Sequence, residues 1–174
     1  MTDLVLSECK WLPPIIDMES FEDYKVFIDF AYSVFKEHYL NGNTIKFKGT
    51  RISYKRYPEK NGYHSTFWHL TTFDYYNNQK EEERLPDMQR CERIRWPKAI
   101  ILNHSCDDPN CDCNKIKVWE MVEKGDRRIK ILYQDQGYLV VLSKRSDYIL
   151  LWTAFQIDKS HRLDKYIKQY ERFK

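Results

Sequence analysis

Glycine and proline are scarce in this chain, which contains five and six of them among 174 residues. That scarcity argues against a collagen-like or low-complexity protein, and a hydrophobic content of 42% argues against disorder. No run approaches the roughly 18 apolar residues of a membrane-spanning helix, and the N-terminus is acidic where a signal peptide is basic. These absences predict a folded, cytoplasmic protein that does not bind membranes.

Cysteine is also sparse: an odd number, five, in a chain without a secretory signal favours reduced thiols or a metal site over a disulfide framework. The turn-rich stretch HSCDDPNCDCN places four soft ligands within ten residues, namely His104, Cys106, Cys111 and Cys113. This composition suits zinc, although the spacing is not a paired C-x-x-C arrangement. The loop therefore either binds a structural zinc ion, which would hold it closed, or carries free thiols.

The net charge of +3 is unevenly distributed. It is about −5 over residues 1–43, +5 over 44–69, −3 over 70–126 and +6 over 127–174. If the two basic segments share one face, that face attracts phosphates; otherwise they form a solvated surface. Aromatic residues make up 16% of the chain, so stacking surfaces are available as well.

The first half of the chain reads as helix, hairpin, strand and helix. Apolar residues recur at helical spacing after a capping box at Ser20 and Asp23. Residues 44–57 alternate around Gly49, which predicts a hairpin with a basic outer face. The aromatic run 63–73 is interpreted as a strand, and a helix carrying several arginines begins near 85–87, with Pro97 interrupting it.

The second half predicts a meander of four strands and a last helix. The four apolar runs, separated by short turns, span 116–122, 127–133, 138–144 and 148–157. Asp158 or Ser160 then caps a terminal helix. The prediction is one α+β domain over 1–174, with an acidic helical segment at 1–43 and the core at 44–174. Its four-stranded antiparallel sheet packs on helices on one face and leaves the other face open for a substrate.

Two polar residues in apolar surroundings are candidates for chemistry. His69, in the run FWHLT, is either an acid–base catalyst or a buried imidazole bonded to the backbone. Thr153 is the one polar residue on the strand face that it shares with Ile149, Leu151, Phe155 and Ile157. Its hydroxyl is therefore either hydrogen-bonded within the core or a donor to a ligand phosphate. Tyr148 faces away from Thr153 in a regular strand, so a shared site would need a bulge.

Arginines supply candidate phosphate contacts. Lys144 and Arg145 occupy a predicted turn, and Arg90 and Arg93 share one face of a predicted helix. Each guanidinium group either braces a pentacoordinate phosphate or pairs with a neighbouring carboxylate.

The order of five segments resembles that of the phage-associated branch of the barnase, EndoU, colicin D and RelE-like ribonuclease superfamily. In chain order these segments are HLT, the arginine-bearing helix, YLVVL, R-x-x-Y and TAF. The likeness covers roughly residues 63–174. It implies a barnase/RelE-like domain whose open sheet face cleaves RNA without a metal ion. By that resemblance His69 and Thr153 match active-site positions, and Arg145 with Tyr148 match the R-x-x-Y turn.

The expected function is that of a metal-independent endoribonuclease, toxin-like or phage-related. The 2′-OH would attack the adjacent phosphate to give a 2′,3′-cyclic phosphate. The expected catalytic residues are His69, Arg93, Arg145, Tyr148 and Thr153. The expected RNA contacts are Lys55, Arg56, His64, Arg90, Lys144 and Trp152.

The expected partners are tRNA or mRNA together with an antitoxin or immunity protein. No cofactor is expected for catalysis, and zinc would be structural. The alternative is a non-catalytic RNA- or protein-binding module with a zinc-clipped Cys/His loop. Such a module would bind with a steep salt dependence and release no product.

Overall fold

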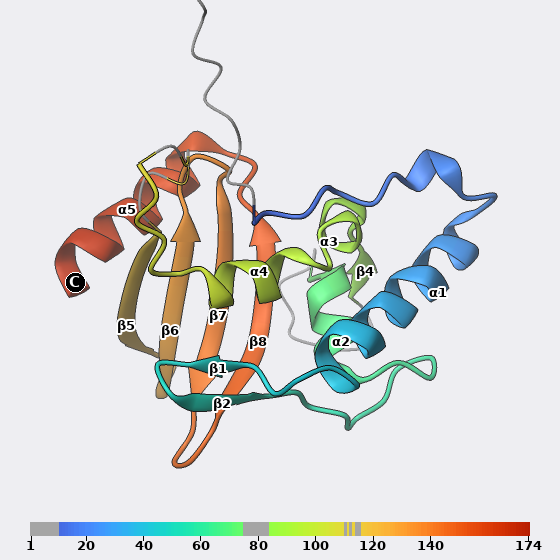
Figure 1. The fold of residues 1–174 in the computed structure, drawn as a ribbon, viewed down its shortest axis with the longest axis horizontal. Coiled ribbons are helices and arrows are strands. Elements are labelled where there is room, and N and C mark those ends of the chain that lie inside the picture. The colour runs from blue at the N-terminus through green and yellow to red at the C-terminus, as the bar shows by residue number, and fades with distance from the viewer. Residues whose placement is uncertain (1–10, 75–83, 110, 112, 114–115) are drawn as a thin grey trace, which may run out of the picture.

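Four long strands near the C-terminus form the centre of the fold (Figure 1). The computed structural model of the chain describes residues 11–74, 84–109, 111, 113 and 116–174. Its strands are β1 Lys46–Phe47, β2 Thr50–Ser53, β3 Thr72–Phe73, β4 Leu85–Pro86, β5 Lys117–Glu123, β6 Asp126–Tyr133, β7 Tyr138–Lys144 and β8 Ile149–Gln156. Its helices are α1 Tyr24–Phe35, α2 Ser65–Thr71, α3 Met88–Glu92, α4 Trp96–Leu102 and α5 Ser160–Phe173, with a 3-10 turn at Met18–Ser20 and a π turn at Lys36–Leu40.

The main sheet differs from the expected one. In the described part of the chain it has six strands in the order β1-β2-β8-β7-β6-β5 and curls into an open half-barrel. The expectation of a four-stranded, barnase/RelE-like sheet is therefore wrong. The four C-terminal strands pair antiparallel with their neighbours, but the hairpin of β1 and β2 joins them because β2 pairs parallel with β8 at Ile52 and Ile149.

Helices cover both faces of the sheet rather than one. On one face, α4 packs with the core cluster that includes Ile131 and Val140, and Figure 1 shows α4 crossing that face. On the opposite face, α5 packs with Trp119, Leu139 and Val141. Lys159 is the N-cap residue of α5 and makes no side-chain capping bond, so the expected cap at Asp158 or Ser160 is not formed. The face predicted to be open is thus partly covered.

The N-terminal helix forms where helical spacing predicted it, with a different cap. Asp23 is the N-cap residue of α1, and its carboxylate accepts a hydrogen bond from the Val26 N–H at 2.9 Å. Ser20 lies before the helix, in the 3-10 turn. Phe27, Ala31 and other apolar residues of α1 are buried. The helix lies on the side of α2 and α3 that faces away from β8 (Figure 1).

The aromatic run 63–73 is mainly a helix, α2, and not the expected strand; its last two residues, Thr72 and Phe73, form the short strand β3. Tyr63, Phe67 and Leu70 recur at a helical spacing and all enter the core. The N–H groups of Ser65 and Thr66 donate to the carbonyls of Arg56 and Lys55, which satisfies the first turn of α2. Across the described residues we find no helix with the length and apolar character to span a bilayer.

Candidate functional site

A cavity of about 650 Å³ lies between the end of α2, the uncovered part of the sheet and the start of α5. Among the described residues, its wall has six basic side chains against three carboxylates, so it favours an anion. The basic residues are Arg84, Arg90, Lys124, Arg128, Lys130 and Arg162, and the acidic ones are Asp74, Glu123 and Asp126. His69, Trp152 and Thr153 also line this cavity, which we call the basic pocket.

Arg128 is the guanidinium in the basic pocket that is best placed for a ligand. It is 8% exposed and lies over the Trp152 ring, 4.2 Å from the ring centre. One terminal nitrogen donates to Asp126 at 3.0 Å, whereas the other is buried without a hydrogen-bond partner among the described residues. Burial lowers the pKa of this guanidinium, and Asp126 counteracts the shift. A buried charged donor left unpaired is unfavourable, and an anionic oxygen would satisfy it.

Lys130 lies two residues along the same face of β6 and is 3% exposed. Its ammonium contacts Glu123 at 3.3 Å and Gln169 at 3.2 Å. Burial lowers the pKa of this lysine, and Glu123 acts in the opposite direction. The two basic side chains on this buried strand face thus each have one carboxylate beside them.

Arg90, an expected RNA contact, is instead bonded to the backbone. One of its terminal nitrogens donates to the Thr72 carbonyl at 2.8 Å and the His69 carbonyl at 3.2 Å. Its guanidinium lies between the rings of Phe73 and Phe155. Burial lowers the pKa of Arg90 to about 10, so it stays charged at neutral pH. Arg90 therefore caps the C-terminal end of α2 and fixes its position.

Thr153 enters the basic pocket because β8 contains a bulge. Val141 of β7 pairs with Thr153 and Leu142 with Leu151, so Trp152 has no partner of its own. The bulge turns Thr153 to the face of Trp152, away from Leu151, which lies in the core. The prediction that Thr153 and Leu151 lie on the same face of the strand is therefore wrong. The bulge that a site shared by Tyr148 and Thr153 would need is present.

The Thr153 hydroxyl has a defined partner. It donates to the carbonyl of His69 at 3.3 Å, and Arg90 donates to the hydroxyl at 3.4 Å. The hydroxyl thus ties β8 to α2 instead of extending into the cavity. This makes Thr153 a positioning residue for His69.

The His69 imidazole lies at the junction of two cavities. Its ring centre is 5.6 Å from the Trp152 ring, and it lines both the basic pocket and a smaller cavity of about 220 Å³. Its backbone is fixed by Arg90 and Thr153. His69 and Thr153, which are expected catalytic residues, and Trp152, an expected RNA contact, thus line one cavity.

Arg145 and Tyr148 line a neighbouring cavity of about 410 Å³ on the other side of Trp152. We call it the tyrosine pocket; its wall consists of Arg51, Ser53, Tyr54, Lys55, Arg145, Tyr148, Leu150 and Trp152. Lys55 and Trp152 are the expected RNA contacts in this wall. The two expected catalytic residues, Arg145 and Tyr148, therefore lie beside His69's pocket rather than in it.

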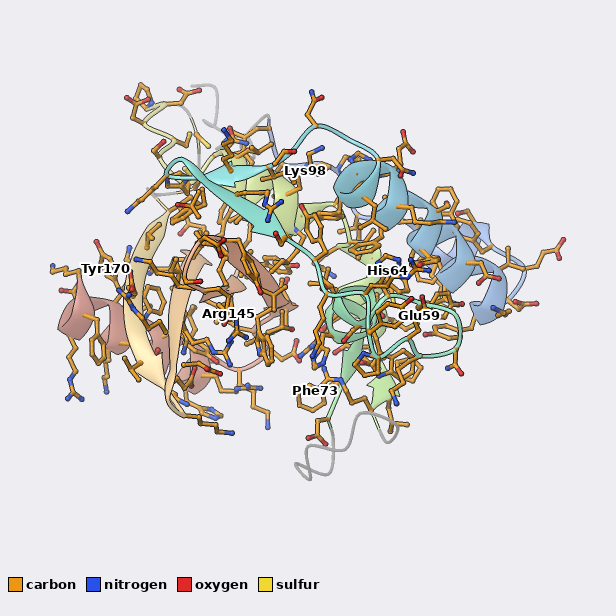
Figure 2. The ribbon with its side chains drawn as sticks, turned by 90° about the horizontal axis from the view of Figure 1, so that it is seen from below. Glu59, His64, Phe73, Lys98, Arg145 and Tyr170 are labelled. Atoms are coloured by element: carbon orange, nitrogen blue, oxygen red, sulfur yellow. The ribbon has the colours of Figure 1, made fainter. Side chains whose placement is uncertain are left out.

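Four expected residues lie outside both cavities. Arg93 bonds the Gln89 carbonyl and lies over Trp96, and Lys144 pairs with Glu120. Arg56 pairs with Glu59 at the surface. His64 packs against Tyr32 and Phe35, and burial lowers its pKa. Figure 2 shows His64 and Glu59 among the helices, apart from Arg145 on the sheet side.

The cysteine-rich loop brings together three of its four expected ligands. The sulfur atoms of Cys106, Cys111 and Cys113 lie within 4.8 Å of one another and could hold a metal ion. His104 is not among them: its Nδ1 lies 2.8 Å from the Ile101 carbonyl and its ring packs on Phe47. Cys111 is disulfide-bonded, contrary to the expectation of reduced thiols, and it would have to be reduced to bind a metal.

Sequence reasoning missed the basic side chains that the sheet contributes to the site, above all Arg128 and Lys130. A signal for them exists, because they alternate with Ile129 and Ile131 in a predicted strand that precedes YLVVL, a run that is apolar at every position. Charges in the buried row of such a strand mark either ion pairs or a binding site.

Comparison of the chain with protein-family models, with curated proteins and with solved structures gave no match.

Proposed function

We propose that this protein is an endoribonuclease that cleaves RNA without a metal ion. The observation that carries the proposal is the position of His69, an imidazole in the wall of a pocket rich in basic side chains. Its neighbour Arg128 has a buried donor that no described residue satisfies. The short motifs that resemble the ribonuclease superfamily support the same function.

In the proposed reaction the His69 imidazole takes the proton of the ribose 2′-OH. The 2′-oxygen bonds to phosphorus and the bond to O5′ breaks, while O5′ takes up a proton from water. The products are a 2′,3′-cyclic phosphate and a 5′-OH, and the imidazolium returns its proton to water. Arg128 donates to the phosphate oxygens as negative charge accumulates on them. Arg90 and Thr153 hold His69 in place.

The proposal revises the roles expected from sequence. Arg128 replaces Arg93 and Arg145 as the cation at the scissile phosphate, because Arg93 lies elsewhere and Arg145 lines the neighbouring cavity. Thr153 positions the imidazole rather than the phosphate. Tyr148 has no place in the reaction step.

The test is incubation of the protein with tRNA, mRNA and a synthetic single-stranded RNA in EDTA, followed by end-group analysis. We expect cleavage with cyclic phosphate ends, and we expect His69→Ala to lower the rate by about 10²–10⁴-fold. His161→Ala is the matched control, because His161 lies on α5 outside the basic pocket. Loss of wild-type cleavage in EDTA, or full activity in His69→Ala, would contradict the proposal.

The second candidate is a binding module that holds RNA in the basic pocket without cutting it. The cysteine group favours it, because sulfur ligands suit a structural zinc ion that would clip the 104–113 loop once Cys111 is reduced. In the same experiment, binding by the wild type with no product under any condition, including added zinc and magnesium, would favour this module.

A further inference from the structure

The tyrosine pocket carries positive charge that no carboxylate of its own wall offsets among the described residues. Arg51, Lys55 and Arg145 line it, and no carboxylate does among the described residues. Arg51 and Lys55 form no ion pair within the described part of the chain. Arg145 has only a distant carboxylate, Asp126, at 3.9 Å. A cavity with three cations and no internal anion is suited to a phosphate.

The tyrosine pocket and the basic pocket adjoin each other. Trp152 lines both, and the small cavity beside His69 shares Lys55 and Leu150 with the tyrosine pocket. Asp126 contacts Arg128 of the basic pocket and Arg145 of the tyrosine pocket. One ligand can therefore pass from one pocket to the other across Trp152.

The aromatic side chains indicate which phosphate-bearing ligand fits. Tyr148, in the wall of the tyrosine pocket, and Trp152, in the wall of both pockets, are partly exposed. Proteins that bind single-stranded nucleic acid combine a basic groove along the backbone with aromatic rings for unpaired bases. A duplex would keep its bases stacked on each other and out of reach of these rings.

We propose that the tyrosine pocket binds the phosphate next to the scissile one, so that the substrate is a single strand crossing Trp152. The scissile phosphate lies at Arg128, and Arg51 and Arg145 bind its neighbour. This inference rests on the proposed function for the identity of the scissile phosphate. It goes further in assigning a second subsite and the single-stranded class of substrate.

The test measures binding separately from cleavage. The probe is a fluorescent single-stranded 2′-deoxy oligonucleotide of about eight nucleotides, which cannot be cut by 2′-OH attack. Its affinity is measured by anisotropy over a range of salt concentrations for the wild type, Arg51→Gln and Arg145→Gln. We expect each variant to bind about tenfold more weakly and to reduce the salt slope by about 0.7. We expect a duplex of the same sequence to bind more weakly than the single strand.

Arg127→Gln is the matched control, because Arg127 is an exposed arginine on β6 that pairs with Glu120 outside both pockets. Far-ultraviolet circular dichroism checks that each variant is folded. If Arg145→Gln is misfolded, Arg51→Gln still tests the subsite, because Arg51 is exposed on the hairpin. Unchanged slopes in the folded variants, equal binding of the duplex, or no binding by the wild type would overturn the subsite. Altered slopes without any RNA cleavage would support the subsite and contradict the ribonuclease proposal.

Discussion

At the scale of single residues, the most informative group is Arg128. Its guanidinium is nearly buried, stacks on Trp152 and has one terminal nitrogen without a hydrogen-bond partner among the described residues. Burying a charge is unfavourable unless it is paired and hydrogen-bonded, and Asp126 supplies only part of that compensation. The protein thus carries an arginine that a bound anion would stabilise.

We predict that Arg128→Gln weakens binding of the uncleavable oligonucleotide at least tenfold, since it removes a charge-assisted hydrogen bond to phosphate. Arg128→Lys should not restore the affinity, because an ammonium group lacks the planar fork that both stacks on Trp152 and donates to two acceptors. Anisotropy measures the affinity, and thermal unfolding reports whether each variant folds. Wild-type affinity in Arg128→Gln would show that Arg128 does not contact the ligand, and wild-type affinity in Arg128→Lys would show that the charge alone suffices.

At the scale of elements, the site depends on the junction between α2 and β8. The bulge at Trp152 turns Thr153 toward α2, and the Thr153 hydroxyl donates to the carbonyl of His69. Arg90 from α3 donates to the same carbonyl. Residues of β8 and α3 therefore fix one backbone position of α2, the one from which the imidazole projects.

Thr153→Val keeps the side-chain shape and removes this hydroxyl. We predict that kcat falls about fivefold, as expected for the loss of one hydrogen bond, whereas KM changes little because the Thr153 hydroxyl bonds the His69 carbonyl and not the ligand. Thr153→Ser should restore most of kcat. Thr44→Val, at an exposed position outside the pockets, serves as control. A rise in KM at constant kcat would instead make Thr153 a substrate contact.

The same junction shows what sequence can and cannot predict here. The four C-terminal strands follow from alternation and turn residues, because those signals are local. The helix α2 was missed because seven residues rich in aromatics fit a strand as well as a helix, and only the burial of Phe67 and Leu70 decides. The bulge at Trp152 and the pairing of β2 with β8 depend on contacts distant in sequence.

These limits determined how well the site could be predicted. His69, Thr153 and Trp152 could be identified from residue type and motif, and the structure brings them together. Arg128 could not be linked to them, because its proximity to Trp152 depends on pairing across β6, β7 and β8. Arg93 was expected near them, yet α3 ends before it and its side chain turns to Trp96.

At the scale of the whole molecule, buried tyrosines determine the response to high pH. Burial raises the pKa of Tyr24, Tyr39, Tyr54 and Tyr138 above their ordinary value. The folded protein therefore holds these protons more tightly than the unfolded chain does. Their contribution to stability is complete below about pH 10 and is lost as pH rises above it. Arg90, Arg128 and Lys130, whose pKa values burial lowers, act in the opposite direction. They are three groups against six tyrosines, because burial also raises the pKa of Tyr63 and Tyr166.

We therefore predict that the free energy of unfolding falls steeply above about pH 10, measured by denaturant titration at a series of pH values. Tyr54→Phe should shift this loss to higher pH, because it removes one of the responsible groups. At neutral pH the variant should be as stable as the wild type or more stable by about 1 kcal/mol, since the Tyr54 hydroxyl is buried without a hydrogen-bond partner in the described residues. Tyr57→Phe is the control, because Tyr57 is 64% exposed. An equal shift in both variants would mean that burial of Tyr54 is not the cause.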